Sequence, residues 1–132
     1  MVVTLTTETP MEPGNKLQIS GIIPEDSQRI QVGLGSSRKD LSFYMDVRFW
    51  NNTVVFNTRE DGKWGKEIIH ANPYKRGSEF EVTVDYTKHN YVVMMGGNTH
   101  VTIPNRLNTH RTKQIMMSDD VELHGFSLKP SN

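Results

Sequence analysis

The sequence predicts an antiparallel all-β domain, and three observations support this. Short runs alternate apolar and polar residues with a period of two, as half-buried strands do. Glycine, proline, asparagine and aspartate separate these runs, and no stretch places apolar residues at a sustained helical spacing. A two-sheet sandwich is favoured over a closed barrel, although both give such a pattern. No internal repeat or linker divides residues 1–132, so we expect a single domain.

The first half of the chain alternates most clearly in residues 41–48. Its apolar face is Leu41, Phe43, Met45 and Val47, and its polar face is Ser42, Tyr44, Asp46 and Arg48. Before it we expect an edge strand near residues 2–5 and strands over 16–20 and 29–35. After it we expect a strand over 53–57 and a tight turn at Asp61-Gly62.

The second half continues the same organisation. Residues 79–85 alternate, residues 91–95 form an apolar run that ends in the turn signal at 96–98, and residues 101–103 return. Residues 121–128 alternate with a phase slip at Gly125, which predicts a β-bulge and a second edge strand. Residues 107–117 are the least regular stretch, and a helical turn is the element expected there.

Composition excludes several classes of function. Lysine plus arginine number 15 and aspartate plus glutamate number 15, so the balance argues against nucleic acid as a partner. The absence of cysteine excludes disulfides, thiolate catalysis and cysteine-bound metal. The five histidines form no metal-ligand motif, so we expect neither metal nor cofactor. The N-terminal residues do not resemble a secretory signal, and no apolar run suits membrane insertion, so we expect a cytoplasmic protein.

Residues 41–67 concentrate the chemistry that a polyhydroxylated ligand needs. The polar face of 41–48 offers Arg48, the next strand ends at Asn57, and Trp64 and Glu67 follow the turn. A sugar needs directional donors and acceptors for its hydroxyls and an aromatic plate for its apolar C–H face. Arg48 and Glu67 can pair and fix each other for hydroxyl contacts. On pattern alone, a tryptophan that anchors the core explains Trp64 equally well.

The segments LSFYMDVRF, TVVFNTREDGKWGKE and IPNRL resemble the galectins, a family of β-galactoside-binding lectins. The family motif is H-x-N-x-R, then V-x-N, then W-x-x-E-x-R. Arg48, Val55, Asn57, Trp64 and Glu67 match it. The resemblance implies that Trp64 stacks on galactose, that Asn57 and Glu67 hold the 6-hydroxyl, and that Arg48 reaches the 4-hydroxyl and the next sugar.

The sequence departs from the motif at three positions. Tyr44 replaces the histidine, Asp46 the asparagine and Ile69 the last arginine. Tyr44 and Asp46 therefore remain candidate binding residues with changed chemistry, since a carboxylate has lost the amide donor. Each lost buried hydrogen bond costs about 1 kcal/mol, so these changes are expected to weaken galactoside binding or redirect its specificity.

The resemblance also implies the architecture and the biology. The fold is expected to be a two-sheet jelly-roll-like sandwich that binds its ligand across the concave sheet. The expected function is non-catalytic recognition of galactose-containing glycans or glycoconjugates, in a protein that is cytoplasmic or exported without a signal peptide to the extracellular space. A homodimer through the edge strands near residues 2–5 and 121–128 is a further expectation. The alternative is a galectin-fold protein with a decayed sugar site that acts through protein contacts.

A glycosidase is a third hypothesis from another class. Retaining glycosidases place two carboxyl groups about 5 Å apart. Asp46 and Glu67 are the candidate pair, but Arg48 between them would keep both ionised and leave no general acid. We therefore predict that the protein is not an enzyme.

Overall fold

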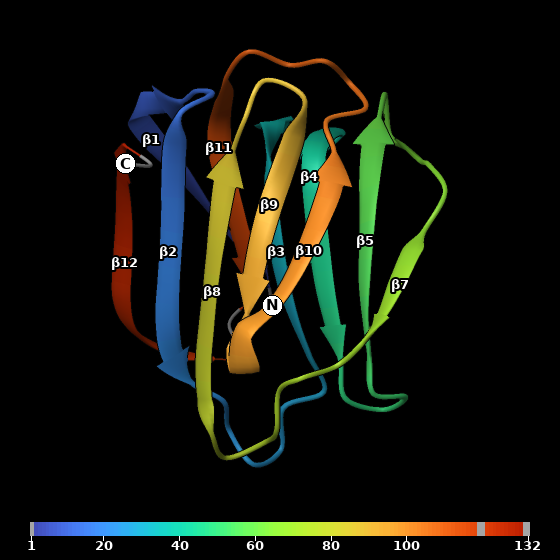
Figure 1. The fold of residues 1–132 in the computed structure, drawn as a ribbon, viewed down its shortest axis with the longest axis vertical. Coiled ribbons are helices and arrows are strands. Elements are labelled where there is room, and N and C mark those ends of the chain that lie inside the picture. Colours follow the sequence, from blue (N-terminus) through green and yellow to red (C-terminus); the bar gives the residue numbers. More distant parts are fainter. Residues whose placement is uncertain (1, 119–120, 131–132) are drawn as a thin grey trace.

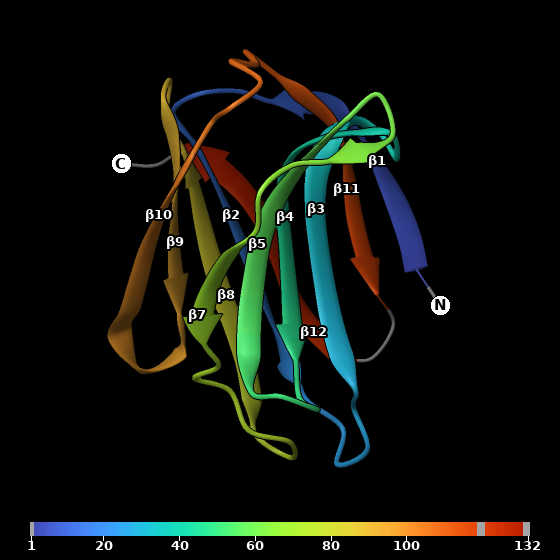
Figure 2. The ribbon, with the colours of Figure 1, turned by 90° about the vertical axis from the view of Figure 1, so that its right-hand side faces the viewer.

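The computed structural model describes residues 2–118 and 121–130, and these form two antiparallel sheets packed face to face (Figures 1 and 2). The first has seven strands in the order β1-β11-β3-β4-β5-β6, with β7 also paired to β5. The second has five strands in the order β10-β9-β8-β2-β12. This confirms the predicted all-β sandwich.

The seven-stranded sheet contains the strand pair β4–β5, on which the candidate site is built. Its strands are β1 (Val2–Met11), β3 (Arg29–Ser37), β4 (Asp40–Arg48), β5 (Thr53–Glu60), β6 (Lys63–Trp64), β7 (Ile68–Ala71) and β11 (Thr112–Ser118). The five-stranded sheet contains β2 (Asn15–Ile22), β8 (Glu79–Tyr86), β9 (Asn90–Met95), β10 (Thr99–Pro104) and β12 (Glu122–Pro130). A 3-10 turn, η1 (Gly96–Asn98), joins β9 to β10.

The predicted alternation of residues 41–48 is wrong at its start. A register shift between Leu41 and Tyr44 places Leu41 in a separate cluster with Tyr44 and Met116. Ser42 is buried instead and hydrogen-bonds with the hydroxyl of the core residue Tyr91 over 2.6 Å.

The core lies between the sheets and follows the predicted alternation from Phe43 onward. Phe43, Met45 and Val47 of β4 point into it and are fully buried, and they meet apolar residues such as Val82 and Val84 of β8 in one continuous cluster. The opposite side of β4 is thereby directed to the outer face of the seven-stranded sheet. The alternation of one strand therefore decides which of its residues are available to a ligand.

Two predicted irregularities are present, whereas the helical turn expected in residues 107–117 is not. Asp61 and Gly62 both have positive φ, 51° and 79°, as the tight turn between β5 and β6 requires. The pairing of β12 with β2 shifts register between Leu123 and Gly125, which confirms the bulge. Residues 107–117 hold no helical turn, because most of this stretch belongs to β11, which fills the space between β1 and β3.

The pairing of β3 with β4 decides which side chains of the two strands lie next to one another in the site. The two strands form a hairpin in which Arg29 lies opposite Arg48 and Gln31 lies opposite Asp46. Phe49, just after β4, donates its backbone N–H to the Gln28 carbonyl and holds the strand ends together. Side chains of β3 are thus placed beside the polar face of β4.

Candidate functional site

A groove of about 510 Å³ crosses the outer face of the seven-stranded sheet. It runs over β3, β4 and β5 to β6 and the segment that follows it. Its lining residues are Arg29, Gln31, Tyr44, Arg48, Val55, Asn57, Trp64, Gly65 and Glu67.

A row of alternating charges forms one part of the groove. The Asp46 carboxylate is fully buried and accepts from Arg29 Nε (3.1 Å), Arg29 Nη2 (2.6 Å) and Arg48 Nε (2.9 Å). Arg48 Nη2 lies 3.6 Å from Glu67 Oε2. The Asp46 carboxylate also raises the pKa of the Arg29 guanidinium. Arg48 therefore bridges two carboxylates, as predicted, and its guanidinium is held in one orientation.

Two aromatic side chains form the opposite part of the groove. Trp64 is 46% exposed, and its ring centroid lies 4.6 Å from that of Tyr44, with the planes tilted by 53°. Arg59 places its guanidinium carbon 5.2 Å from the Trp64 ring centroid. Trp64 is thus a partly covered aromatic plate at the surface and not a core anchor.

Tyr44 is buried, and its hydroxyl points toward β3. The Gln31 amide donates to that hydroxyl over 2.6 Å. Burial raises the pKa of the Tyr44 phenol above its ordinary value, so the phenol keeps its proton. Tyr44 can therefore donate one hydrogen bond from the floor of the groove.

Hydrogen bonds fix Asn57 and the segment after Trp64. Asn57 Nδ2 donates to the Gly65 carbonyl over 3.0 Å, and Gly65 N–H donates to the Thr58 carbonyl over 2.9 Å. Arg106 Nη2 donates to the Lys66 carbonyl over 2.8 Å. Asn57 Oδ1 accepts from the Thr58 N–H over 2.7 Å. One amide N–H of Asn57 remains for a ligand.

The structure brings together every predicted binding residue except one. Tyr44, Arg48, Val55, Asn57, Trp64 and Glu67 all line the groove. Asp46 lies beneath it, because two arginines surround its carboxylate. Ile69, at the third departure from the motif, pairs with Val55 and is 59% exposed, so an apolar side chain stands at the rim. Whether these residues hold a sugar stays a prediction.

Sequence reasoning missed several residues that shape the groove. Arg29 and Gln31 reach it from β3, and Gly65 and Arg106 shape the wall. A signal for the first two was present: they alternate within the predicted strand 29–35, and a hairpin with 41–48 places them beside Asp46. Arg106 lies in the IPNRL segment that resembles galectins, but its contact with Lys66 could not be predicted locally, since the two residues lie far apart in the chain.

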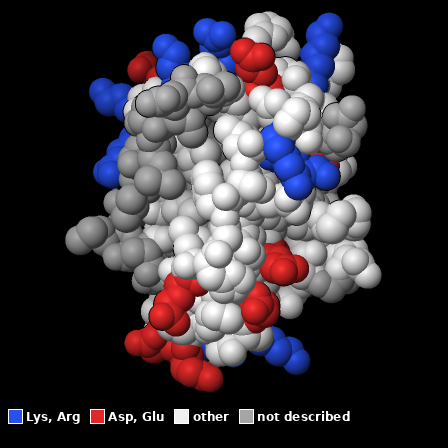
Figure 3. All heavy atoms as spheres, turned by 90° about the vertical axis from the view of Figure 1, so that its left-hand side faces the viewer, with Lys and Arg blue, Asp and Glu red and all other residues white. Residues whose placement is uncertain are grey.

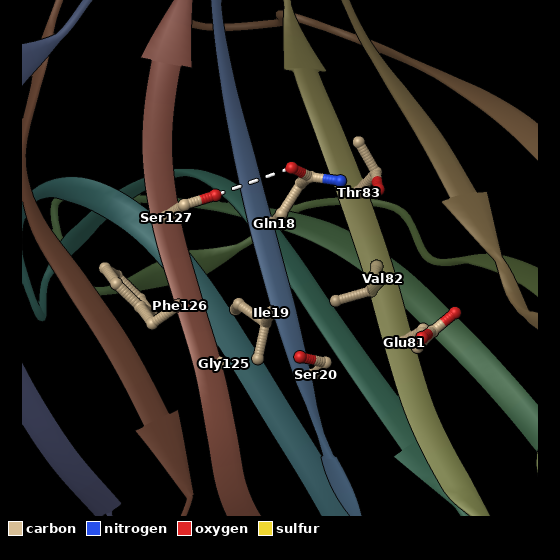
Figure 4. Close-up of a pocket in the computed structure, with 9 residues that line it drawn as sticks. All are labelled: Gln18, Ile19, Ser20, Glu81, Val82, Thr83, Gly125, Phe126 and Ser127. Carbon is tan, nitrogen blue, oxygen red and sulfur yellow. Dashed lines mark hydrogen bonds between the residues drawn. The ribbon is translucent and has the colours of Figure 1, made fainter.

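The rest of the described structure offers no metal site but has a further hollow. Within residues 2–118 and 121–130, no group of three or more His, Asp or Glu residues is arranged to hold a metal ion, and no helix has the length and hydropathy to cross a membrane. A second hollow, of about 330 Å³, lies on the outer face of the five-stranded sheet (Figure 4). Gln18, Ser20, Thr83, Gly125 and Ser127 border it. It lies on the opposite side of the sandwich from the groove.

Comparison with known proteins decides the family. A family model described as galactoside-binding lectin matches residues 2–128. The chain belongs to the galactoside-binding lectins. Galectin-2 of Mus musculus is 30% identical over 120 residues, which cover 90% of this chain and 92% of that protein. The predicted resemblance to galectins is confirmed, and with it the prediction of a non-catalytic carbohydrate-binding protein rather than an enzyme.

Solved structures of galectins share the fold. A homodimeric agglutinin from chicken liver superposes with a TM-score of 0.89 at 24% identity, covering 98% of this chain and 100% of that chain. A toad ovary galectin in complex with thio-digalactose gives a TM-score of 0.89 at 21% identity, covering 97% of this chain and 98% of that one. The sandwich described above is therefore the galectin sandwich.

Proposed function

We propose that this galectin binds β-galactoside-containing oligosaccharides through the groove, with a specificity altered or weakened by its own substitutions. The observation that carries the proposal is the half-exposed Trp64 beside the Arg48–Glu67 ion pair in one groove. An apolar sugar face can lie on the indole while hydroxyls meet the guanidinium and the carboxylate. The toad ovary galectin, which has the same fold, is known in complex with the galactose-containing ligand thio-digalactose.

The altered specificity follows from what faces the ligand. The Asp46 carboxylate already accepts hydrogen bonds from two arginines, so it is not available to accept one from an axial 4-hydroxyl. Tyr44 supplies one O–H donor where the family motif has an imidazole. Ile69 supplies no polar group to a second sugar. Each missing hydrogen bond weakens binding by about 1 kcal/mol, roughly fivefold in dissociation constant.

A glycan array followed by calorimetric titration tests this function. We expect galactose-terminated glycans to be bound, and lactose to give saturable heat with a weaker affinity than a galectin that carries the complete motif, measured in parallel. A correctly folded protein that retains no glycan on the array would refute the proposal. Preferential binding of glycans that lack galactose would show that the specificity has been redirected to another sugar.

A second candidate function has one observation in its favour. Tyr44 and Arg59 both approach the Trp64 ring, so part of the stacking surface is already occupied by the protein. A decayed sugar site, with protein contacts as the function, would be consistent with this arrangement. Saturable heat with lactose would reject this second candidate.

The proposal includes a homodimer formed through the edge strands. β1 and β12 are the outer strands of their sheets and lie on the left-hand side of the sandwich in Figure 1. On that side acidic groups cluster at one end and most basic groups lie toward the other (Figure 3). β12 itself carries Glu122 near its start and Lys129 near its end. Antiparallel pairing of two copies would therefore place opposite charges together.

Sedimentation of charge variants tests the dimer. We expect wild-type protein to sediment at twice the mass of the chain, and Lys129→Glu to weaken the association. The double variant Glu122→Lys/Lys129→Glu restores opposite charges and is expected to recover it. A monomer at all concentrations would contradict the dimer.

The cellular location remains the prediction made from the sequence, and fractionation of cells and medium is its measurement.

A further inference from the structure

We propose that Trp50 forms a second stacking subsite next to the groove, and that this subsite takes an uncharged sugar ring of a longer glycan. The inference rests on the proposed glycan binding and extends it to the size and chemistry of the ligand. Trp50 lies in the turn between β4 and β5 and matches no part of the galectin motif.

Trp50 lies next to the groove, because its ring contacts two arginines that line the groove. The guanidinium carbons of Arg29 and Arg48 lie 5.5 and 5.6 Å from the centroid of the Trp50 ring, and both arginines belong to the groove lining. Trp50 is nevertheless 54% exposed, more than Trp64 at 46%. Its ring therefore contacts the arginines and still presents a large apolar surface to solvent.

The donors around Trp50 are fixed and incompletely used. Asp46 accepts two N–H groups from Arg29 and one from Arg48, while a guanidinium carries five. The remaining N–H groups lie beside an exposed indole. An aromatic plate with neighbouring charged donors is the same combination that Trp64 makes with Arg48, so the chemistry suits a second sugar ring.

The charge balance selects an uncharged ring. The positive charges of Arg29 and Arg48 are opposed by Asp46, which both contact, and by Glu67, which lies 3.6 Å from Arg48. The row has no net charge. A sialylated or sulfated sugar would gain no unopposed cation there, whereas a neutral ring needs only hydroxyl contacts and an apolar surface.

Calorimetry with a short and a long glycan tests the subsite in the full chain. Lactose, a neutral galactose-terminated tetrasaccharide and a sialylated tetrasaccharide are titrated into wild type, Trp50→Ala, Trp50→Phe and Met94→Ala. Met94 is an exposed control on the other sheet. We expect the wild type to bind the tetrasaccharide about three- to tenfold more tightly than lactose. Trp50→Ala is expected to remove that gain, Trp50→Phe to keep part of it, and Met94→Ala to change nothing.

Fluorescence gives an independent measurement, because the chain has two tryptophans. In Trp50→Phe only Trp64 emits, so the difference from wild type is the Trp50 signal. We expect this difference to respond to the tetrasaccharide and not to lactose.

The outcomes separate this inference from the proposed function. A wild type that binds neither glycan refutes both. A wild type that binds both glycans with no gain for the longer one, or a gain that survives in Trp50→Ala, refutes the subsite alone. An equal loss for both glycans in Trp50→Ala would show that Trp50 only positions the arginines. A Trp50-dependent gain limited to a sialylated tetrasaccharide would overturn the assignment to an uncharged ring.

Discussion

Replacing Trp64 with alanine is expected to abolish measurable glycan binding while the protein stays folded. The indole supplies the apolar plate of the groove, and no other aromatic ring among the groove-lining residues is similarly exposed. Loss of a central tryptophan in a binding site costs about 2 kcal/mol or more, roughly thirtyfold or more in dissociation constant. Lactose calorimetry and the glycan array are the measurements.

Trp64→Phe is the matched control for this prediction. It keeps a smaller aromatic plate, so weakened but detectable binding is expected. Because Trp64 is half exposed, both variants are expected to keep the wild-type circular dichroism spectrum and nearly the same thermal midpoint. Unchanged affinity in folded Trp64→Ala would mean that the glycan does not use this groove.

Asp46→Ala is expected to show the largest loss of stability among the site variants. The carboxylate is fully buried and accepts three N–H groups, and its removal leaves Arg29 and Arg48 facing an empty space. Removing one partner of a buried ion pair costs about 3–5 kcal/mol. Arg29 is 40% exposed and can turn to solvent, which places the expected loss near the lower end. Urea unfolding measures it as a lower midpoint at unchanged slope.

Asp46→Asn separates charge from shape in the same pocket. The amide keeps the size and one acceptor, so an intermediate loss of stability is expected. Sugar binding by Asp46→Ala is expected to fall as well, since Arg48 loses the group that orients it. An unfolding midpoint of Asp46→Ala equal to that of wild type would contradict the structural role assigned to this carboxylate.

Much of the fold could be predicted because alternation and turn chemistry are local. The two faces of β4 from Phe43 onward, the Asp61-Gly62 turn and the bulge at Gly125 all followed from residues adjacent in sequence. The register shift between Leu41 and Tyr44, which exchanges the faces of Leu41 and Ser42, did not. β11 could not be recognised in this way, because its pairing with β1 and β3 depends on strands far away in the chain. Pairing between strands that are distant in the chain has little effect on the local alternation of apolar and polar residues.

The site was predictable in its composition and less so in its contacts. Alternation correctly placed Tyr44 and Arg48 on the outer face of β4, and it placed Asp46 there too. It could not show that Arg29 arrives from β3 and covers the Asp46 carboxylate. The same strand pairing brings Gln31 to Tyr44 and both arginines to Trp50. The chemistry of a side chain thus depended on its cross-strand neighbour as much as on its own identity.

The hydrogen bonds that hold Gly65 and Lys66 have a thermodynamic consequence. This wall of the groove is tied to Thr58, Asn57 and Arg106 in the absence of any ligand. Loops that become ordered on binding lose entropy, and that loss subtracts from affinity. Here little such entropy remains to be lost, so a glycan meets a preorganised surface. Differences in affinity between glycans are then expected to arise from their own contacts and flexibility rather than from rearrangement of the protein.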